Sequence, residues 1–501
     1  MTRALLAAGL VLHGLVAPRA RAQVPPPGGG PPDGATPSAN APSEDDGART
    51  PRVEQIPGHV EPPHYLPLRF DEDYRGLADA PTGDPLDPIK HVALGRRAWL
   101  SLGGQHRLRF QVIEGPSAGA ASPPRTSEMF VRNLVHADLH AHPSARVFVQ
   151  LGSSFALGNP PSGPPETDLF DVQQLFVEAH HDFGPLALSL RVGRQEMPLG
   201  STRWVSARDG TNVRQTFDLV RLEAEGEGWS AESFFGFVPE VRRGVLDDGV
   251  DPDDRFFGSY WTFAFLDALH VEAFYLGRQR DAAYEPLEDG SPGLVGRETR
   301  HTLGLRFDGT LATGFEYIVH GLVQTGTLDA PATNARVLAW GFAGGLWQRL
   351  PGALSDVRVG VRWDALSGDE RAGDRKLGTF HPLFPNLSFF AVLPTVHPEN
   401  LYGVHPLVTF DRGPVGLSFG TIVFFRPSLG DAIFRPGGVL APAQASDARR
   451  SGALLSLSFT YALARHLRFD AEYAHLFVGP GLAPVMSRDT DYFGTWLTLT
   501  Y

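Results

Sequence analysis

Apolar and polar residues alternate along most of this chain, in segments of about ten residues. In residues 466–473, for example, Leu467 and Phe469 alternate with Arg468 and Asp470. Side chains of a β-strand point alternately to its two faces, so each segment is predicted to be a strand with one apolar and one polar face. The predicted strands cover residues 100–112, 130–141, 145–157, 170–182, 186–195, 216–226, 229–239, 257–266, 269–279, 298–308, 313–327, 335–348, 356–365, 400–410, 415–426, 451–463, 466–473 and 491–501.

The connectors between these segments alternate between short and long. Tight turns are predicted at His142–Ala145, His181–Pro185, Glu225–Gly228, Leu266–Leu269, Asp308–Gly314, Arg349–Ser355, Asp411–Gly416 and Leu463–Arg465. Long connectors are predicted at 114–128, 158–169, 196–215, 240–256, 280–297, 367–399, 427–450 and 479–490, with 328–334 as a shorter member of the set. Outer-membrane barrels have short periplasmic turns and long outer loops, so the alternation predicts an antiparallel barrel. About eighteen strands agree with the even number found in single-chain bacterial barrels.

The polar faces of the predicted strands carry many charges, and this indicates which side meets lipid. Residues 100–112 place Leu108 and Phe110 on one face and Arg107 and Arg109 on the other. A barrel this wide holds water inside and contacts lipid outside, and its closure leaves no unpaired backbone edge in the bilayer. The predicted fold class is therefore all-β, a single antiparallel transmembrane β-barrel over residues 98–501. The alternative is a soluble all-β fold with its apolar face inward.

The last predicted strand has the same two faces as the others. Phe493 and Leu497 fall on its apolar face, whereas Tyr492 and Thr498 fall on the opposite face, and the chain ends on an aromatic residue. Many bacterial outer-membrane barrels end in this way. We predict that this strand closes the barrel by pairing with residues 99–112.

Three segments precede the predicted barrel. Residues 1–22 have a positive start at Arg3, a short apolar core and a small-residue cleavage site at Ala20-Arg21-Ala22, which is the pattern of a signal peptide. Residues 23–60 are rich in Pro, Gly, Ser, Ala and acids and are predicted to be a disordered periplasmic segment. Residues 61–97 form a pre-barrel segment that is predicted to pack in or under the barrel mouth. The predicted location is the bacterial outer membrane.

Composition narrows the chemistry. The chain has no cysteine, which excludes a disulfide framework, a thiolate zinc site and a cysteine nucleophile. Its hydrophobic content of 42% is too low for a helical membrane bundle but suits a barrel, which averages polar and apolar faces. The net charge of -12 argues against a nucleic-acid binder. Lys90 and Lys376 are the only lysines, so nearly all positive charge is guanidinium.

Arginine dominates the polar faces. The predicted lumen carries Arg107, Arg109, Arg132, Arg191, Arg221, Arg306, Arg358, Arg362 and Arg468, with Asp138, Glu178, Glu223, Asp364, Asp470 and Glu472 among them. Guanidinium groups stay charged and pair with carboxylates or phosphates, and rings of such groups select anions. One interpretation is an anion-conducting path in which the acids act as spacers that keep binding weak. The other is a set of arginine–acid ladders that neutralise each other and hold the wall together.

A dense set of distinctive residues lies around the connector 196–215. It comprises Gly193-Arg194-Gln195-Glu196, Gly200, Arg203, Asn212, Arg214 and Phe217-Asp218-Leu219-Val220-Arg221-Leu222. This set resembles the core signature of the alginate-export family, and Phe380–Pro385 is similar to a second motif of that family. The resemblance covers about residues 95–501 and implies an eighteen-strand outer-membrane barrel that passively exports an anionic polysaccharide through an arginine-rich constriction. By position in the motif, it points to Arg191, Arg194, Arg203, Arg214, Asp218 and Arg221.

Metal and catalytic interpretations have weaker support. The acidic stretch 247–254 lacks the spacing of an EF-hand and is interpreted as a solvated loop. Its weak candidates for a cation are Asp247, Asp248, Asp251, Asp253 and Asp254. In Glu178-Ala179-His180-His181-Asp182 the strand period separates His181 from Glu178 and His180, which argues against a three-ligand site. Because the chain also shows no nucleophile-elbow motif, we predict no catalytic residues and no cofactor.

The sequence therefore predicts a channel and not an enzyme. Its predicted cargo is an anionic polysaccharide or oligosaccharide, an alginate-like polyuronate, that passes down its gradient. The alternatives are a general anion-preferring porin for small solutes and, from another class, a barrel enzyme. The predicted partners are outer-membrane lipid and lipopolysaccharide, the anionic saccharide, the barrel-assembly machinery and periplasmic export proteins, with no nucleic acid.

Overall fold

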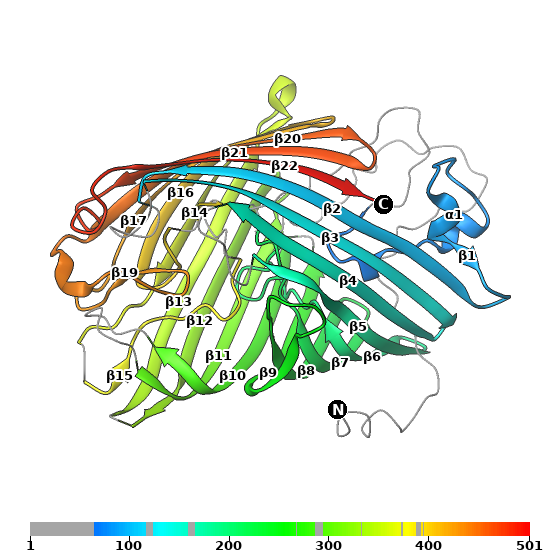
Figure 1. Cartoon of the computed structure of the whole chain (residues 1–501), viewed down its shortest axis with the longest axis horizontal. Coiled ribbons are helices and arrows are strands. Elements are labelled where there is room, and N and C mark those ends of the chain that lie inside the picture. Colours follow the sequence, from blue (N-terminus) through cyan, green and yellow to red (C-terminus); the bar gives the residue numbers. More distant parts are fainter. Residues whose placement is uncertain are drawn as a thin grey trace.

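The chain forms a closed barrel of eighteen antiparallel strands in the computed structural model (Figure 1). The structure describes residues 65–116, 124–158, 166–266, 268–285, 294–331, 333–371, 374–386, 392–393 and 395–501. The predicted signal peptide, residues 1–22, and the predicted disordered segment, residues 23–60, lie outside the described residues.

The barrel strands follow one another around the wall. They are β2 (Trp99–Glu114), β3 (Arg125–His142), β4 (Ala145–Gly158), β5 (Asp168–Phe183), β6 (Leu186–Gln195), β7 (Phe217–Gly226), β8 (Trp229–Glu240), β9 (Gly249–Leu266), β10 (Leu269–Glu285), β11 (Leu294–Thr310), β12 (Phe315–Ala330), β13 (Thr333–Arg349), β14 (Val357–Leu366), β16 (Leu401–Arg412), β17 (Val415–Phe425), β20 (Arg450–Ala464), β21 (Leu467–Val478) and β22 (Thr490–Thr500). β22 pairs with β2 from Gln105 opposite Thr500 to Glu114 opposite Asp491. The predicted closure by the last strand is confirmed.

Short and long connectors alternate as predicted, with the short turns at one end of the barrel and the long connectors at the other. Four long connectors were predicted too long, namely 114–128, 240–256, 280–297 and 328–334, and the difference is largest for two of them. β9 begins at Gly249, and β10 and β11 extend to Glu285 and from Leu294, so the true connectors are shorter than 240–256 and 280–297. These strand ends are rich in charged residues, and the apolar alternation that marks a strand is missing there.

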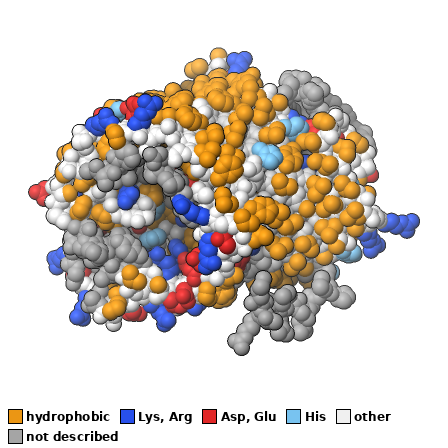
Figure 2. Space-filling model, in the orientation of Figure 1, with side chains coloured by type: hydrophobic (Ala, Val, Ile, Leu, Met, Phe, Trp, Pro, Cys, Tyr) orange, Lys and Arg blue, Asp and Glu red, His pale blue; other side chains and the backbone are white. Residues whose placement is uncertain are grey.

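The outer and inner faces of the wall also follow the predicted pattern. Leu108 and Phe110 are 48% and 45% exposed, whereas Arg107 and Arg109 beside them are 6% and 4% exposed. Apolar side chains cover much of the outer face (Figure 2). The apolar face of the wall therefore points outward, and the polar face points into the lumen. Within the described part of the chain, no helix is long and apolar enough to cross a membrane.

The pre-barrel residues lie at the short-turn end. They form η1 (Arg69–Asp71), η2 (Arg75–Ala78), α1 (Asp87–Lys90) and the short β1 (Val92–Ala93), which pairs with the start of β2. α1 and the C-terminus lie at the same end of the barrel (Figure 1). The Arg69 guanidinium donates to the terminal carbonyl of Tyr501 at 3.2 Å.

An aromatic cluster anchors this segment to the inside of the wall. The ring of Phe70 packs edge-on against Phe148 of β4 and Phe176 of β5, with ring centroids 5.7 and 5.3 Å apart. All three rings are buried, and the Arg191 guanidinium of β6 lies 4.5 Å from the Phe70 ring centroid. Residues 65–71 therefore occupy part of the lumen near the short-turn end.

Two long connectors contain further short elements. The connector between β14 and β16 holds β15 (Lys376–Leu377), which pairs with β13. The connector between β17 and β20 holds the hairpin β18 (Ile433–Arg435) and β19 (Gly438–Ala441), followed by η4 (Ala443–Ala445). η3 (Gly352–Leu354) lies in the turn between β13 and β14.

Candidate functional site

The connector 196–216, between β6 and β7, folds into the lumen and is held there by arginines of β2 and β3. Arg107 of β2 donates to the carbonyls of Asp209 and Thr211 at 2.7 and 2.6 Å. Arg109, two residues further along β2, donates to the carbonyl of Gly210 at 2.6 Å. Because a guanidinium carries several donors in a fixed plane, a few arginines can satisfy a whole turn of backbone carbonyls.

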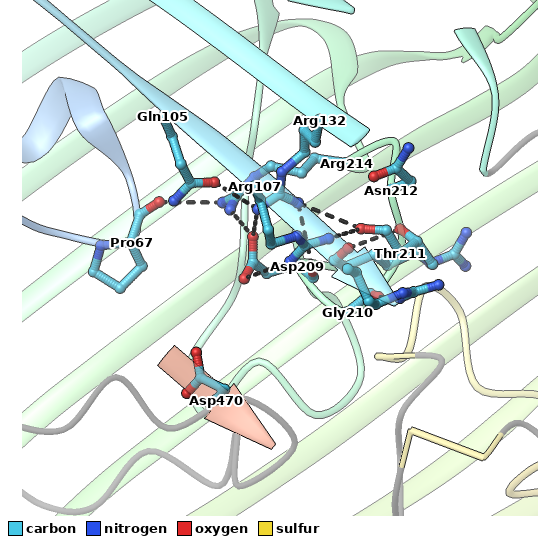
Figure 3. A network of polar contacts seen from close by, with 12 residues as sticks. Pro67, Gln105, Arg107, Arg132, Asp209, Gly210, Thr211, Asn212, Arg214 and Asp470 are labelled. Atoms are coloured by element: carbon cyan, nitrogen blue, oxygen red, sulfur yellow. Dashed lines mark hydrogen bonds and ion pairs between the residues drawn. The ribbon is translucent and has the colours of Figure 1, made fainter. Parts of the chain in front are cut away.

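A second set of contacts converges on the Asp209 carboxylate (Figure 3). Arg132 of β3 lies directly opposite Arg107 in the strand register and pairs with Asp209 at 2.6 Å. Arg214 also pairs with this carboxylate, and Arg107 lies 3.5 Å from it. Burial by itself opposes ionisation of Asp209, but the charges of these arginines outweigh it and hold the pKa of the carboxyl well below its usual range.

Arg214 ties the two ends of the connector together and links it to the pre-barrel segment. Its guanidinium donates to both carboxylate oxygens of Glu196, at 2.9 and 2.7 Å, and to the carbonyl of Pro67 at 3.1 Å. The backbone N–H of Glu196 donates to the side chain of Gln174 on β5 at 3.0 Å. The inward turn is therefore braced from the wall, from its own ends and from the segment at the short-turn end.

The same connector reaches the far side of the lumen. Trp204 donates through its indole nitrogen to His320 of β12 at 3.4 Å, and Arg203 forms an ion pair with Asp364 of β14. The connector between β14 and β16 meets it there, because the N–H of Ser206 donates to the carbonyl of Phe384 and the N–H of Phe384 donates to the carbonyl of Trp204, both at 2.9 Å. Two inward connectors therefore join across the lumen.

An apolar cluster and two further arginines lie where the connectors meet. The Phe384 ring packs against Phe217 and Phe256, with centroids 4.9 Å away in both cases. The guanidinium of Arg278 lies 4.4 Å from the Phe384 ring centroid, and that of Arg208 donates to the carbonyl of Pro385 at 3.2 Å.

Arg208 differs from the other arginines of the connector in its charge environment. Among the described residues, no ion pair involves Arg208. Burial, together with the charge of Arg278, lowers the pKa of Arg208 to about 10, so it remains a cation at neutral pH. Arg208 does not stand out in the sequence, because a residue in an irregular connector has no alternation pattern that marks its direction.

The predicted lumen arginines of the strands face inward, and those away from the inward connector contact acids or a histidine. Arg191 donates to Glu178 at 2.6 Å, and Arg221 lies 2.8 and 2.6 Å from Glu223 and Glu232. The other pairs are Arg306 with Glu272 and Asp308, Arg358 with Glu316, Arg362 with His405, and Arg468 with Asp470. Glu472 accepts a hydrogen bond from the N–H of Val392 at 2.8 Å. Paired ladders therefore line much of the wall.

Two predicted pore-lining residues lie on the other face. Arg194 is directly opposite Leu175 in the register of β5 and β6, and Leu175 is an exposed residue of the outer face. Asp218 is directly opposite Arg194 and forms an ion pair with it at 2.8 Å. Asp218 also shares its strand face with the exposed Val220. The prediction that Arg194 and Asp218 line the pore does not agree with this register. They lie at strand ends, where charge alone does not report direction.

The acidic stretch 247–254 is not a single solvated loop, because β9 begins at Gly249 and includes residues 249–254. Asp254 pairs with Arg278 at 2.6 Å, and the Asp251 carboxylate accepts the backbone N–H of Asp253. Asp248 instead lies close to two acids of β5, Asp168 and Asp171. Neither acid could be linked to Asp248 from the sequence, because about 80 residues separate them from it along the chain.

Comparisons with known proteins agree with this architecture. The family model for alginate export matches residues 98–495. The crystal structure of Pseudomonas aeruginosa OpdO is similar at a TM-score of 0.51 and 12% identity, with 80% of this chain and 97% of that chain covered. Acinetobacter baumannii OccAB1 is similar at a TM-score of 0.53 and 12% identity, with 80% of this chain and 96% of that chain covered. A BenF-like porin from Pseudomonas fluorescens Pf-5 is similar at a TM-score of 0.53 and 10% identity, with 80% of this chain and 98% of that chain covered. No curated protein matches significantly.

Proposed function

Because this chain belongs to the alginate export family and is an outer-membrane channel, we propose that it passes an anionic saccharide, of the alginate-like polyuronate class, down its concentration gradient. The observation that carries the proposal is the arginine cluster at the inward connector. Arg107, Arg109, Arg132 and Arg214 gather there around Asp209 and its neighbours.

The charge count at this cluster supports an anionic cargo. The four arginines face three carboxylates, those of Asp209, Glu196 and Glu166, and Glu166 lies 3.5 Å from Arg109. Four positive and three negative charges leave one positive charge, and Arg208 adds another where the two connectors meet. A water-filled lumen with excess positive charge lowers the energy of a passing anion and raises that of a cation.

The mutual pairing of the arginines suits transport better than tight binding. A polyuronate carries one carboxylate per sugar unit, and a wall of unpaired guanidiniums would hold such a polymer at many points at once. Because most arginines are already paired with acids or carbonyls, each contact with the cargo competes with an existing one. Conduction needs sites that are weak and repeated.

Planar-bilayer recording of the purified full chain tests the proposal. We expect open channels whose reversal potential in a salt gradient indicates preference for chloride over potassium. We also expect transient block by oligouronates and none by neutral oligosaccharides of the same length. Cation preference, or equal block by both sugars, would contradict the proposal.

A general anion-preferring porin for small solutes is the second candidate. Two connectors that meet across the lumen and an apolar cluster around Phe384 favour it, because both take up room that a polymer needs. The length of the blocking sugar separates the two functions. If uronate dimers pass but longer oligomers neither block nor cross, the small-solute function is supported and polymer passage is not.

A further inference from the structure

The outer end of β5 is the end at Asp168, on the side of the long connectors, and it extends beyond Gln195, where β6 ends. The connector between β8 and β9 covers the free edge of β5 there. The N–H groups of Leu169 and Phe170 donate to the carbonyls of Arg243 and Gly244, at 3.2 and 3.3 Å. The N–H of Leu246 donates back to the carbonyl of Phe170 at 2.8 Å. Residues 243–246 therefore pair with β5 as a short extra strand, beyond the point where β6 ends. This pairing brings Asp247 and Asp248 against β5.

Three carboxylates meet at this junction. Asp168 and Asp171 of β5 and Asp248 of the connector each offer one oxygen, and the three oxygens lie within 4.8 Å of one another. Asp168 and Asp171 are only 3% and 4% exposed. Like charges at this separation repel each other, and their burial removes the water that would screen them.

Within the three clustered carboxylates, the hydrogen bonds leave one buried oxygen without a partner. Asp171 accepts the N–H groups of Asp247 and Asp248 at 2.8 and 2.9 Å, and Asp248 accepts the N–H of Arg242 at 2.6 Å. In contrast, Oδ1 of Asp168 is buried and has no hydrogen-bond partner among the described residues. A buried carboxylate oxygen without a donor is costly unless a cation occupies the position.

The nearby arginines do not balance these charges. Arg194 lies 3.8 Å from Asp248 but already makes two hydrogen bonds to Asp218, at 2.8 and 3.0 Å. Arg242 is exposed and pairs with Glu240. In the described part of the chain, no ion pair involves Asp168 or Asp171. The junction therefore holds more negative than positive charge.

We propose that Asp168, Asp171 and Asp248 bind a calcium ion that fixes the β8–β9 connector to the outer end of β5. Calcium takes six to eight oxygen ligands at about 2.3–2.6 Å, so two oxygens that share the ion lie at most about 5 Å apart. The spacing of the three carboxylates meets this limit. Magnesium requires shorter, nearly octahedral contacts and gives up its water reluctantly. Water and backbone carbonyls complete the shell.

Because its carboxylates are buried, this site differs from a surface site where an ion bridges the protein to lipopolysaccharide. A bridging ion needs carboxylates that a lipid phosphate can reach, whereas Asp168 and Asp171 are covered. The ion is therefore structural. It neutralises the junction and leaves Arg194 to its pairing with Asp218 on the outer face.

Calcium titration of the folded full chain tests the proposal, by isothermal calorimetry in detergent after treatment with EDTA. We expect the wild type to bind one calcium ion per chain, and Asp168→Asn combined with Asp248→Asn to weaken that binding by at least tenfold. Asp253→Asn removes an exposed acid from the same acidic stretch and serves as the matched control. A wild type that binds no calcium, or a double variant that binds as tightly as the control, would overturn the proposal.

Limited proteolysis supplies a readout that does not require the double variant to fold normally. Arg242 and Arg243 are exposed in the connector and are sites for trypsin. Calcium should slow cleavage of the wild type and of Asp253→Asn at these arginines several-fold, and magnesium at the same concentration should slow it much less. Equal cleavage with calcium, magnesium and EDTA would show that no ion holds this connector.

Discussion

Asp209→Asn is the sharpest test of how the inward connector sets selectivity. The change keeps the shape of the side chain but removes its charge from three guanidiniums, those of Arg107, Arg132 and Arg214. The connector should stay in place, because Arg107 and Arg109 bind the backbone carbonyls of residues 209–211 and not only the carboxylate. The variant therefore alters charge with little change of shape.

The size of the effect follows from the charge count. Around Asp209, four arginines and three acids give a net charge of +1, and the variant raises it to +2. At a distance of about 6 Å in water, one unit charge changes the energy of a passing ion by about 0.7 kcal/mol, and salt at about 0.1 M reduces this to about 0.4 kcal/mol. Anions gain about twofold and cations lose about twofold, so their permeability ratio rises about fourfold.

Reversal potentials in a potassium chloride gradient measure this ratio. Asp356→Asn is the matched control, because it removes the same charge from an exposed turn between β13 and β14. The control should keep the wild-type ratio. An unchanged ratio in Asp209→Asn, or a shift toward cations, would refute the reasoning, and a several-fold rise in conductance would show that the connector had moved.

Three further predictions concern the wall and the pre-barrel segment. Phe70→Ala should destabilise the pre-barrel segment by about 3–5 kcal/mol and raise conductance, measured by thermal unfolding and bilayer recording. Burial lowers the pKa of Lys90 to about 8 from its ordinary 10.5. The folded chain therefore binds fewer protons than the unfolded chain between these values, and stability should rise from pH 8 to pH 10 in the wild type but less in Lys90→Met. Arg191→Glu should prevent assembly, because it places a second buried carboxylate beside Glu178; heat-modifiable gel mobility reports this, and normal mobility would contradict it.

For Arg191, the sequence predicts the face of the strand but not the partner of the side chain. The alternation of residues 186–195 placed it on the polar face, and the structure agrees. Its partner is Glu178, which lies directly opposite in the strand register at 2.6 Å. A charge on a polar face can line water or pair with a neighbour, and only the register decides between them.

The inward connector could be recognised from its motif but not placed. Arg203, Asn212 and Arg214 stand out in the sequence, yet no local pattern shows that residues 209–211 meet Arg107 and Arg109 about 100 residues away. The same holds for Arg208 and for the cluster of Asp168, Asp171 and Asp248. These contacts join segments that are distant along the chain, so their formation depends on how the closed barrel brings the strands together.

The sequence by itself determined the strands, their two faces, the parity of the connectors and the closing role of the last strand. Each of these is a local property: a side chain alternates with its neighbours, and an apolar face must leave water. The tertiary structure alone decided which acid neutralises each arginine and which connector enters the lumen. Those depend on strand register and on packing across the barrel, where a shift of one residue moves every side chain to the opposite face.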